Sequence, residues 1–164
     1  MKTLKIKNAK LYIWSNFQNL ILDKAPKKLP KAPNYLKHVL EKPMTDAEIQ
    51  ETWAINPYSI GEFLALITEL IGKQPNREDG PLLTNGYINI FYVQLKGRVV
   101  AASVYWGSLD REWNCDAYGL VDVDWNDGSC VFSRSLTSQN ISVSDLDGEI
   151  IKIKGVEYKL TKLK

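Results

Sequence analysis

The chain has 164 residues, of which 45% are hydrophobic and 24% are charged, and its net charge at neutral pH is +2. This length is typical of one domain, and the composition excludes an intrinsically disordered chain, which requires low hydrophobicity and a high net charge. No stretch approaches the roughly 18 consecutive apolar residues of a membrane-spanning helix, so no membrane partner is expected. We therefore expect a single domain over residues 1–164.

The first residues and the two cysteines favour a reducing compartment. Residues 1–8 lack the apolar core of a secretory signal, which predicts a cytoplasmic protein. In that compartment Cys115 and Cys130 are expected to be buried thiols rather than a disulfide. Both lie in strand-like runs, so a cross-strand pair stays open as the alternative.

Charge is distributed unevenly along the chain. Residues 1–43 hold ten lysines against two acidic residues, a net of +8. Residues 44–149 hold six basic against sixteen acidic residues, a net of −10, and residues 150–164 hold five lysines against one glutamate, a net of +4. We expect the basic ends to pack near the acidic middle or to be solvated.

The lysine-rich N-terminal segment suggests a second kind of partner. Clustered lysines release counterions from phosphates, so Lys24–Lys37 could bind nucleic acid. This stretch contains no arginine, and Tyr35 is its only aromatic residue, so it is poorly equipped to read or stack on bases. Nucleic-acid binding is therefore kept as an alternative only.

Strands are predicted near the N-terminus, within residues 3–14. Leu4–Lys7 alternates apolar and polar residues, and Leu11–Trp14 is rich in strand-forming residues. Residues 23–33 then hold three prolines and four lysines. Because proline removes a backbone donor and disfavours helix before it, this stretch predicts an extended loop.

Helices are predicted next, over about residues 34–73. Asn34 is placed to cap a helix over Tyr35–Lys42, which Pro43 would end. Thr45–Glu48 fits a capping box, in which the first side chain binds the backbone amide of the fourth residue and the fourth side chain binds back. This motif predicts a short second helix that ends near Trp53.

A second capping box, Ser59–Glu62, opens the most regular stretch of the chain. Behind it, apolar residues recur at the spacing of one helical face, namely Ile60, Phe63, Leu64, Ile67, Leu70 and Ile71. The pattern predicts the core helix of the domain, ending near Gly72.

From residue 86 the hydrophobic period changes to two, which is typical of strands. The predicted strands are 87–95, 98–106, 112–118 and 129–133, with a terminal hairpin over 149–163. Strands, then helices, then strands favour the α+β class rather than a βαβ array. The prediction is an antiparallel β-meander over about residues 86–163, joined by the strands of residues 3–14 and packed against the helical segment of about residues 34–73.

No catalytic or cofactor-binding set of residues is predicted. His38 is the only histidine, and no Gly-x-Ser-x-Gly motif accompanies it, so a nucleophilic triad has no support. The run from Asp122 to Gly128 lacks the glycine and the glutamate that a calcium loop requires at its sixth and twelfth positions. We interpret it as a turn, and keep as an alternative a metal-dependent hydrolase or nuclease that uses the aspartate cluster of residues 116–127.

The densest unusual feature is a run of aromatic and acidic residues between 105 and 128. Trp113 and Phe132 occupy apolar strand positions and are expected to be buried. Aromatic residues beside turns are better placed to contact a ligand. The predicted ligand-binding residues are Trp106, Asp116, Tyr118, Trp125 and Asp127.

Three stretches carry a resemblance to known proteins: Asn85–Tyr92, Trp113, and Trp125–Arg134, which contains Val-Phe-Ser-Arg. The chain resembles a set of small uncharacterised bacterial and phage proteins that share a Trp-spaced segment ending in this motif. It is also similar to the C-type-lectin-like variable proteins of diversity-generating retroelements, which present variable residues on a fixed scaffold to bind ligands. The chain lacks their glycine-rich ending and continues past Arg134.

Together these patterns predict a non-catalytic binding or interaction protein. Its partner would be a protein or a small ligand, and no cofactor is expected. The contact surface would lie around residues 105–128.

Overall fold

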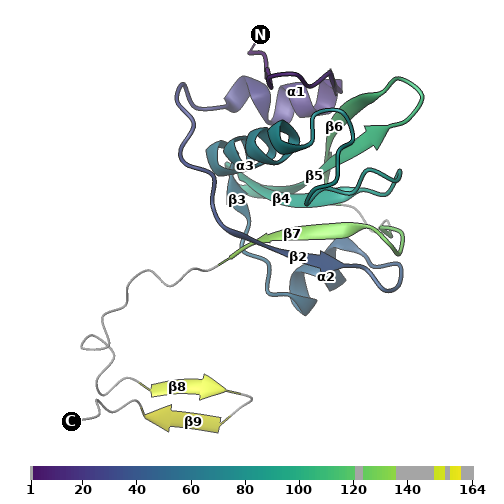
Figure 1. Ribbon diagram of the computed structural model, residues 1–164. Coiled ribbons are helices and arrows are strands. Elements are labelled where there is room, and N and C mark those ends of the chain that lie inside the picture. Colours follow the sequence, from purple (N-terminus) through teal and green to yellow (C-terminus); the bar gives the residue numbers. More distant parts are fainter. Residues whose placement is uncertain (1, 121–123, 136–149, 154–155, 160–164) are drawn as a thin grey trace, which may run out of the picture.

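The computed structural model describes residues 2–120, 124–135, 150–153 and 156–159, with side chains for the first two ranges (Figure 1). The elements of the first half are β1 (Leu11–Ile13), α1 (Ser15–Leu20), the 3-10 helix η1 (Leu22–Lys24), β2 (Tyr35–Val39), α2 (Asp46–Thr52), β3 (Tyr58–Ser59) and α3 (Ile60–Lys73). Those of the second half are β4 (Asn89–Leu95), β5 (Arg98–Gly107), β6 (Glu112–Gly119), β7 (Cys130–Arg134), β8 (Ile150–Ile153) and β9 (Val156–Lys159). The α+β class is confirmed.

The main sheet has the strand order β1-β6-β5-β4-β7-β2, and β3 pairs with the remaining part of β4. Strands β4, β5 and β6 form the predicted antiparallel meander. The expectation of a purely antiparallel sheet is wrong, because β7 crosses to the other side of β4 and pairs with it in parallel. Strands β1 and β3 also pair in parallel, with β6 and β4. The central strand β4 is buried on both faces, and it requires a neighbour at each of its edges.

The predicted helix over residues 35–42 is wrong, because Tyr35–Val39 forms the edge strand β2. It pairs antiparallel with β7, so that Lys37 lies opposite Phe132 and His38 opposite Val131. Its apolar residues, Tyr35, Leu36, Val39 and Leu40, also fit the spacing of one helical face. Its pairing with a strand about a hundred residues away outweighs the local capping signal of Asn34.

The N-terminal prediction is confirmed only in part. Leu11–Ile13 is a strand, whereas Leu4–Lys7 is not. Ile6 is nevertheless buried in the main core, so the apolar residues of this stretch serve packing without strand pairing. The lysine- and proline-rich loop of residues 23–33 is present, apart from the η1 turn at its start.

The C-terminal hairpin is also confirmed in part. Strands β8 and β9 pair antiparallel, with Ile151 opposite Tyr158, as the alternation predicts. They form a two-stranded sheet of their own and do not extend the meander. The expected turn at Gly155 lies outside the described residues.

Helices cover both faces of the main sheet. On one face α1 and α3 lie together (Figure 1), and Phe63 of α3 contacts both Phe17 of α1 and Phe91 of β4 at ring distances of 5.9 and 5.3 Å. On the other face α2 covers a smaller core around Ile90 and Tyr92. None of the helices in the described ranges is long and apolar enough to cross a membrane.

Both predicted capping boxes are confirmed. The Ser59 hydroxyl accepts a hydrogen bond from the Glu62 amide at 3.3 Å, and the Glu62 carboxylate accepts one from the Ser59 amide at 2.9 Å. Thr45 and Glu48 form the same reciprocal pair at the start of α2. The two motifs fix where each helix begins, and therefore which residues each helix turns toward the sheet.

The Ser59→Ala variant is expected to lose about 1 kcal/mol of unfolding free energy, because the first turn of α3 loses its side-chain acceptor. Urea unfolding of this variant and of Ser108→Ala tests the expectation. Ser108 is exposed in the turn between β5 and β6. Equal losses in the two variants would show that the capping contact contributes nothing.

Candidate functional site

The pleat of the strands decides which side chains lie on the face of the sheet that α2 covers, which we call the second face. In β6, Trp113, Cys115 and Ala117 face α1 and α3 and are fully buried, as the alternation predicts. The alternate residues face the other way, namely Glu112, Asn114, Asp116 and Tyr118. The first three of these are also less than 10% exposed, which the sequence did not indicate. The second face therefore contains buried polar groups.

One carboxylate joins three segments on this face. Asp46 is the first residue of α2 and is 4% exposed. Its Oδ1 accepts hydrogen bonds from the Tyr92 hydroxyl and from the Trp125 indole nitrogen, both at 2.7 Å. Burial and the neighbouring Asp46 carboxylate raise the pKa of Tyr92 far above its usual range, which keeps this hydroxyl a donor. The carboxylate thus holds α2, β4 and the turn before β7 together.

Backbone pairing reinforces this junction. Met44 and Trp125 exchange two hydrogen bonds, Met44 N to Trp125 O at 3.1 Å and Trp125 N to Met44 O at 2.9 Å. Behind the turn, Gly128 has a positive φ of 82°, and a side chain there would meet the ring of Tyr87 at 3.0 Å. The position of Trp125 is therefore fixed by both its backbone and its side chain.

Two of the predicted ligand-binding residues, Tyr118 and Trp125, come together. Their rings are 6.3 Å apart at an interplanar angle of 66°, an edge-to-face arrangement. Tyr118 is 39% exposed and Trp125 is half-buried. Burial, together with the neighbouring Asp116 carboxylate, raises the pKa of Tyr118 to about 12. Asp116 itself is 8% exposed, so it supports Tyr118 rather than facing solvent.

The prediction that Trp106 lies on the surface is wrong. It is 5% exposed and packs edge-to-face against Trp113 at 5.5 Å. Trp106 is two and four residues from Val104 and Ala102, which face α3, so the alternation of the strand places its side chain on the same face. This alternation outweighs the proximity of Trp106 to the turn. Trp113 and Phe132 are fully buried, as expected.

The described aspartates of the predicted cluster, Asp116, Asp124 and Asp127, do not converge on a metal site. Asp124 and Asp127 are exposed, Asp116 is buried beside Tyr118, and Asp122 lies outside the described residues. Among the residues that the structure describes, no group of three or more histidine, cysteine, aspartate or glutamate side chains is arranged to hold a metal ion. The metal-dependent alternative therefore stays a prediction with no geometric support.

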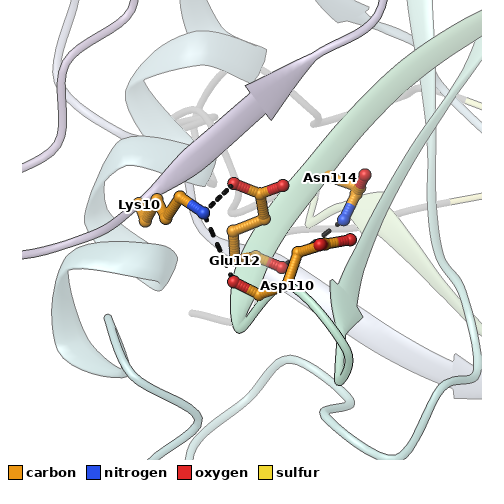
Figure 2. A network of polar contacts seen from close by, with 4 residues as sticks. All are labelled: Lys10, Asp110, Glu112 and Asn114. Atoms are coloured by element: carbon orange, nitrogen blue, oxygen red, sulfur yellow. Dashed lines mark hydrogen bonds and ion pairs between the residues drawn. The ribbon is translucent and has the colours of Figure 1, made fainter.

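Polar contacts also stabilise the second face at the beginning of β6, as Figure 2 shows. The Lys10 ammonium forms an ion pair with Glu112 at 3.1 Å and donates to the Asp110 carbonyl at 3.4 Å. The Asn114 amide donates to the Glu112 carbonyl at 3.5 Å. These contacts fasten the short edge strand β1 to the beginning of β6, and they account for the nearly buried position of Glu112.

A hollow that the sequence patterns did not predict lies beside α2. We call it the α2 groove; its volume is about 820 Å³, and its lining includes His38, Val39, Met44, Glu48, Glu51 and Trp53. The His38 ring stacks on Trp53 with centroids 4.8 Å apart and an interplanar angle of 20°. His38 Nε2 also lies 2.8 Å from the Ser133 hydroxyl. The sequence patterns did not predict this site, because its lining depends on residues 35–39 forming the strand β2 instead of a helix.

The Ser133–His38 contact resembles two members of a nucleophilic triad. Ser133, however, is only 5% exposed and does not line the α2 groove. A serine nucleophile has to reach a substrate carbonyl, and this hydroxyl is closed off by the sheet. The contact is better explained as an anchor that orients the imidazole over Trp53.

Both cysteines are free and buried, in agreement with the expected thiols. Burial raises the pKa of the Cys115 thiol to about 12, which keeps it protonated and unreactive. Burial also raises the pKa of Cys130. Neither thiol is suited to serve as a nucleophile near neutral pH.

No family model, curated protein or solved structure matches this chain. The resemblances that the sequence suggests therefore stay predictions. The candidate site rests on the geometry of the chain itself.

The Asp46→Ala variant is expected to lose about 3 kcal/mol of unfolding free energy, because it leaves the Tyr92 hydroxyl and the Trp125 indole without their common acceptor. Asp46→Asn keeps an oxygen at the same position and is expected to lose only about 1 kcal/mol. Urea unfolding compares the two variants. Similar losses in both would mean that charge at the start of α2, and not the shared acceptor, stabilises this junction.

His38 is expected to make stability depend on pH. Burial lowers its pKa below the ordinary value of 6.5, so the folded state favours the neutral imidazole. As pH falls below about 6.5, the unfolded chain binds the proton first and the folded state loses free energy. Unfolding measured from pH 7.5 to 5.5 should therefore show a steeper fall for the native chain than for His38→Gln. Parallel curves would contradict this explanation.

Proposed function

We propose that this protein is a non-catalytic binding protein that recognises a basic segment of a partner protein. Its contact surface, which we call the aromatic–acidic face, consists of Tyr118, Trp125, Asp124 and Asp127. Asp116 supports this face from below and Trp106 takes no part in it. The observation that carries the proposal is the accessible edge-to-face pair of Tyr118 and Trp125, in which the buried Asp46 carboxylate holds the Trp125 indole.

Rigidity supports this proposal. Binding costs free energy whenever side chains must be ordered at the interface, and rigid aromatic residues keep that cost small. Trp125 is fixed by Asp46 and by its backbone pairing with Met44, and Tyr118 lies on β6 and packs edge-to-face against Trp125. The two rings are thus held in place before a partner arrives.

Charge indicates the chemistry of the partner. Asp124 and Asp127 are exposed beside the aromatic pair, within a stretch of the chain (residues 44–149) that has a net charge of −10. Lysine and arginine side chains are attracted both to carboxylates and to the faces of tryptophan and tyrosine rings. A basic segment therefore complements this face better than an acidic or a purely apolar one.

The test is a titration of ¹⁵N-labelled protein with a lysine-rich peptide and with a glutamate-rich peptide of equal length. The indole signal of Trp125, assigned with Trp125→Phe, is expected to shift with the lysine-rich peptide only. Tyr118→Ala should weaken this binding roughly tenfold, as for a central contact residue. The effect should also diminish at high salt, since exposed charges are screened.

Tyr12→Ala is the matched control, because Tyr12 is similarly exposed, at 46%, but lies on β1. It should bind the lysine-rich peptide as the native chain does. The proposal fails if the Trp125 signal does not move, or if Tyr118→Ala and Tyr12→Ala weaken binding equally.

A further inference from the structure

The α2 groove shares no lining residue with the aromatic–acidic face, although its Met44 is backbone-paired with Trp125, and it has its own chemistry. Part of its lining, which we call the base, is aromatic and apolar: Trp53 stacks on His38, and Met44 and Val39 line the groove with them. Trp53 and Met44 also pack into the smaller core under α2. The base is therefore fixed, as a preformed ligand site requires.

The wall of the α2 groove is acidic. Three carboxylates line it, from Glu41, Glu48 and Glu51, against the single ammonium of Lys42. Hydrogen bonds from the Thr45 amide and hydroxyl lower the pKa of Glu48, so this carboxylate is ionised near neutral pH. Burial lowers the pKa of His38, so the imidazole adds no positive charge under the same conditions. An apolar base with an acidic wall complements a cation that carries hydrocarbon.

The spread of the carboxylates narrows the choice of cation. In the described part of the chain no three acidic, cysteine or histidine side chains converge as a metal ion requires. Glu48 and Glu51 are three residues apart on α2 and are therefore neighbours on one face of the helix, and Glu41 lines the groove from the segment before α2. Several carboxylates in one lining suit a ligand that carries more than one positive charge.

We propose that the α2 groove binds a small aliphatic polyamine, with its alkyl chain over Trp53 and Met44 and its ammonium groups against Glu48 and Glu51. Burying the methylene groups supplies apolar contact, and the carboxylates supply orientation and long-range attraction. A lysine side chain presents the same alkylammonium chemistry from a peptide. The free amine and the peptide are therefore separate arms of the test.

The experiment titrates the full chain with spermidine, with N-acetyl-lysine methylamide, and with the uncharged diol 1,8-octanediol. Calorimetry gives the affinity, and the indole signal of Trp53, assigned with Trp53→Phe, gives the location. Spermidine is expected to shift the Trp53 signal and to leave the Trp125 signal in place. The diol should bind much more weakly because it offers the carboxylates no charge.

The Glu51→Gln variant removes one carboxylate from the groove and leaves the capping box of α2 intact. It should weaken spermidine binding roughly three- to fivefold, the effect of one partly screened ion pair. Glu69→Gln is the control, since Glu69 is exposed on α3 and makes the same change in net charge. It should leave the affinity unchanged.

The outcomes separate clearly. A Trp53 shift with N-acetyl-lysine methylamide alone supports the site and assigns its ligand to a lysine side chain of a protein. Equal weakening by Glu51→Gln and Glu69→Gln, equal binding of the diol, or no shift of Trp53 with either amine would overturn the proposal. The test of the proposed function measures the Trp125 signal and the effect of Tyr118→Ala. The proposed function can therefore fail or succeed independently of the result for the α2 groove.

Discussion

A single buried carboxylate organises the second face of this domain. Asp46 accepts hydrogen bonds from Tyr92 on the central strand and from Trp125, which is 79 residues further along the chain. A buried polar group is tolerated only when hydrogen bonds replace the water it has lost. The turn that carries Trp125 must therefore close onto α2, and the position of α2 in turn shapes the groove on its other side. Both candidate sites depend on this junction.

Sequence patterns predicted the elements whose signals are local. The capping boxes at Thr45 and Ser59, the apolar stripe of α3 and the meander of β4, β5 and β6 are all confirmed. The helix predicted over residues 35–42 is wrong because pairing with β7 makes residues 35–39 a strand. The local sequence does not indicate this pairing. The parallel position of β7 beside β4 was missed for the same reason: burial of a central strand is a requirement of the whole sheet.

The candidate site was predictable to a similar degree. Aromatic residues beside turns correctly singled out Tyr118 and Trp125, whereas Trp106 has the same position relative to a turn but the opposite strand parity. Parity depends on register, which a sequence gives only when the neighbouring strand is known. In the sequence, Asp46 is indistinguishable from an ordinary acidic residue in the first turn of a helix. The stacking of His38 on Trp53 joins two segments that share no sequence motif. Interactions of this kind become visible only in three dimensions.

Asp46 holds the Trp125 indole in place before any partner binds. Hydrogen exchange of the Trp125 indole proton, followed by NMR in the native chain and in Asp46→Ala, measures this contact. Exchange requires the hydrogen bond to open, so we expect a strongly protected proton in the native chain and fast exchange in the variant. An indole proton that exchanges at the same rapid rate in both would show that Asp46 does not hold the ring.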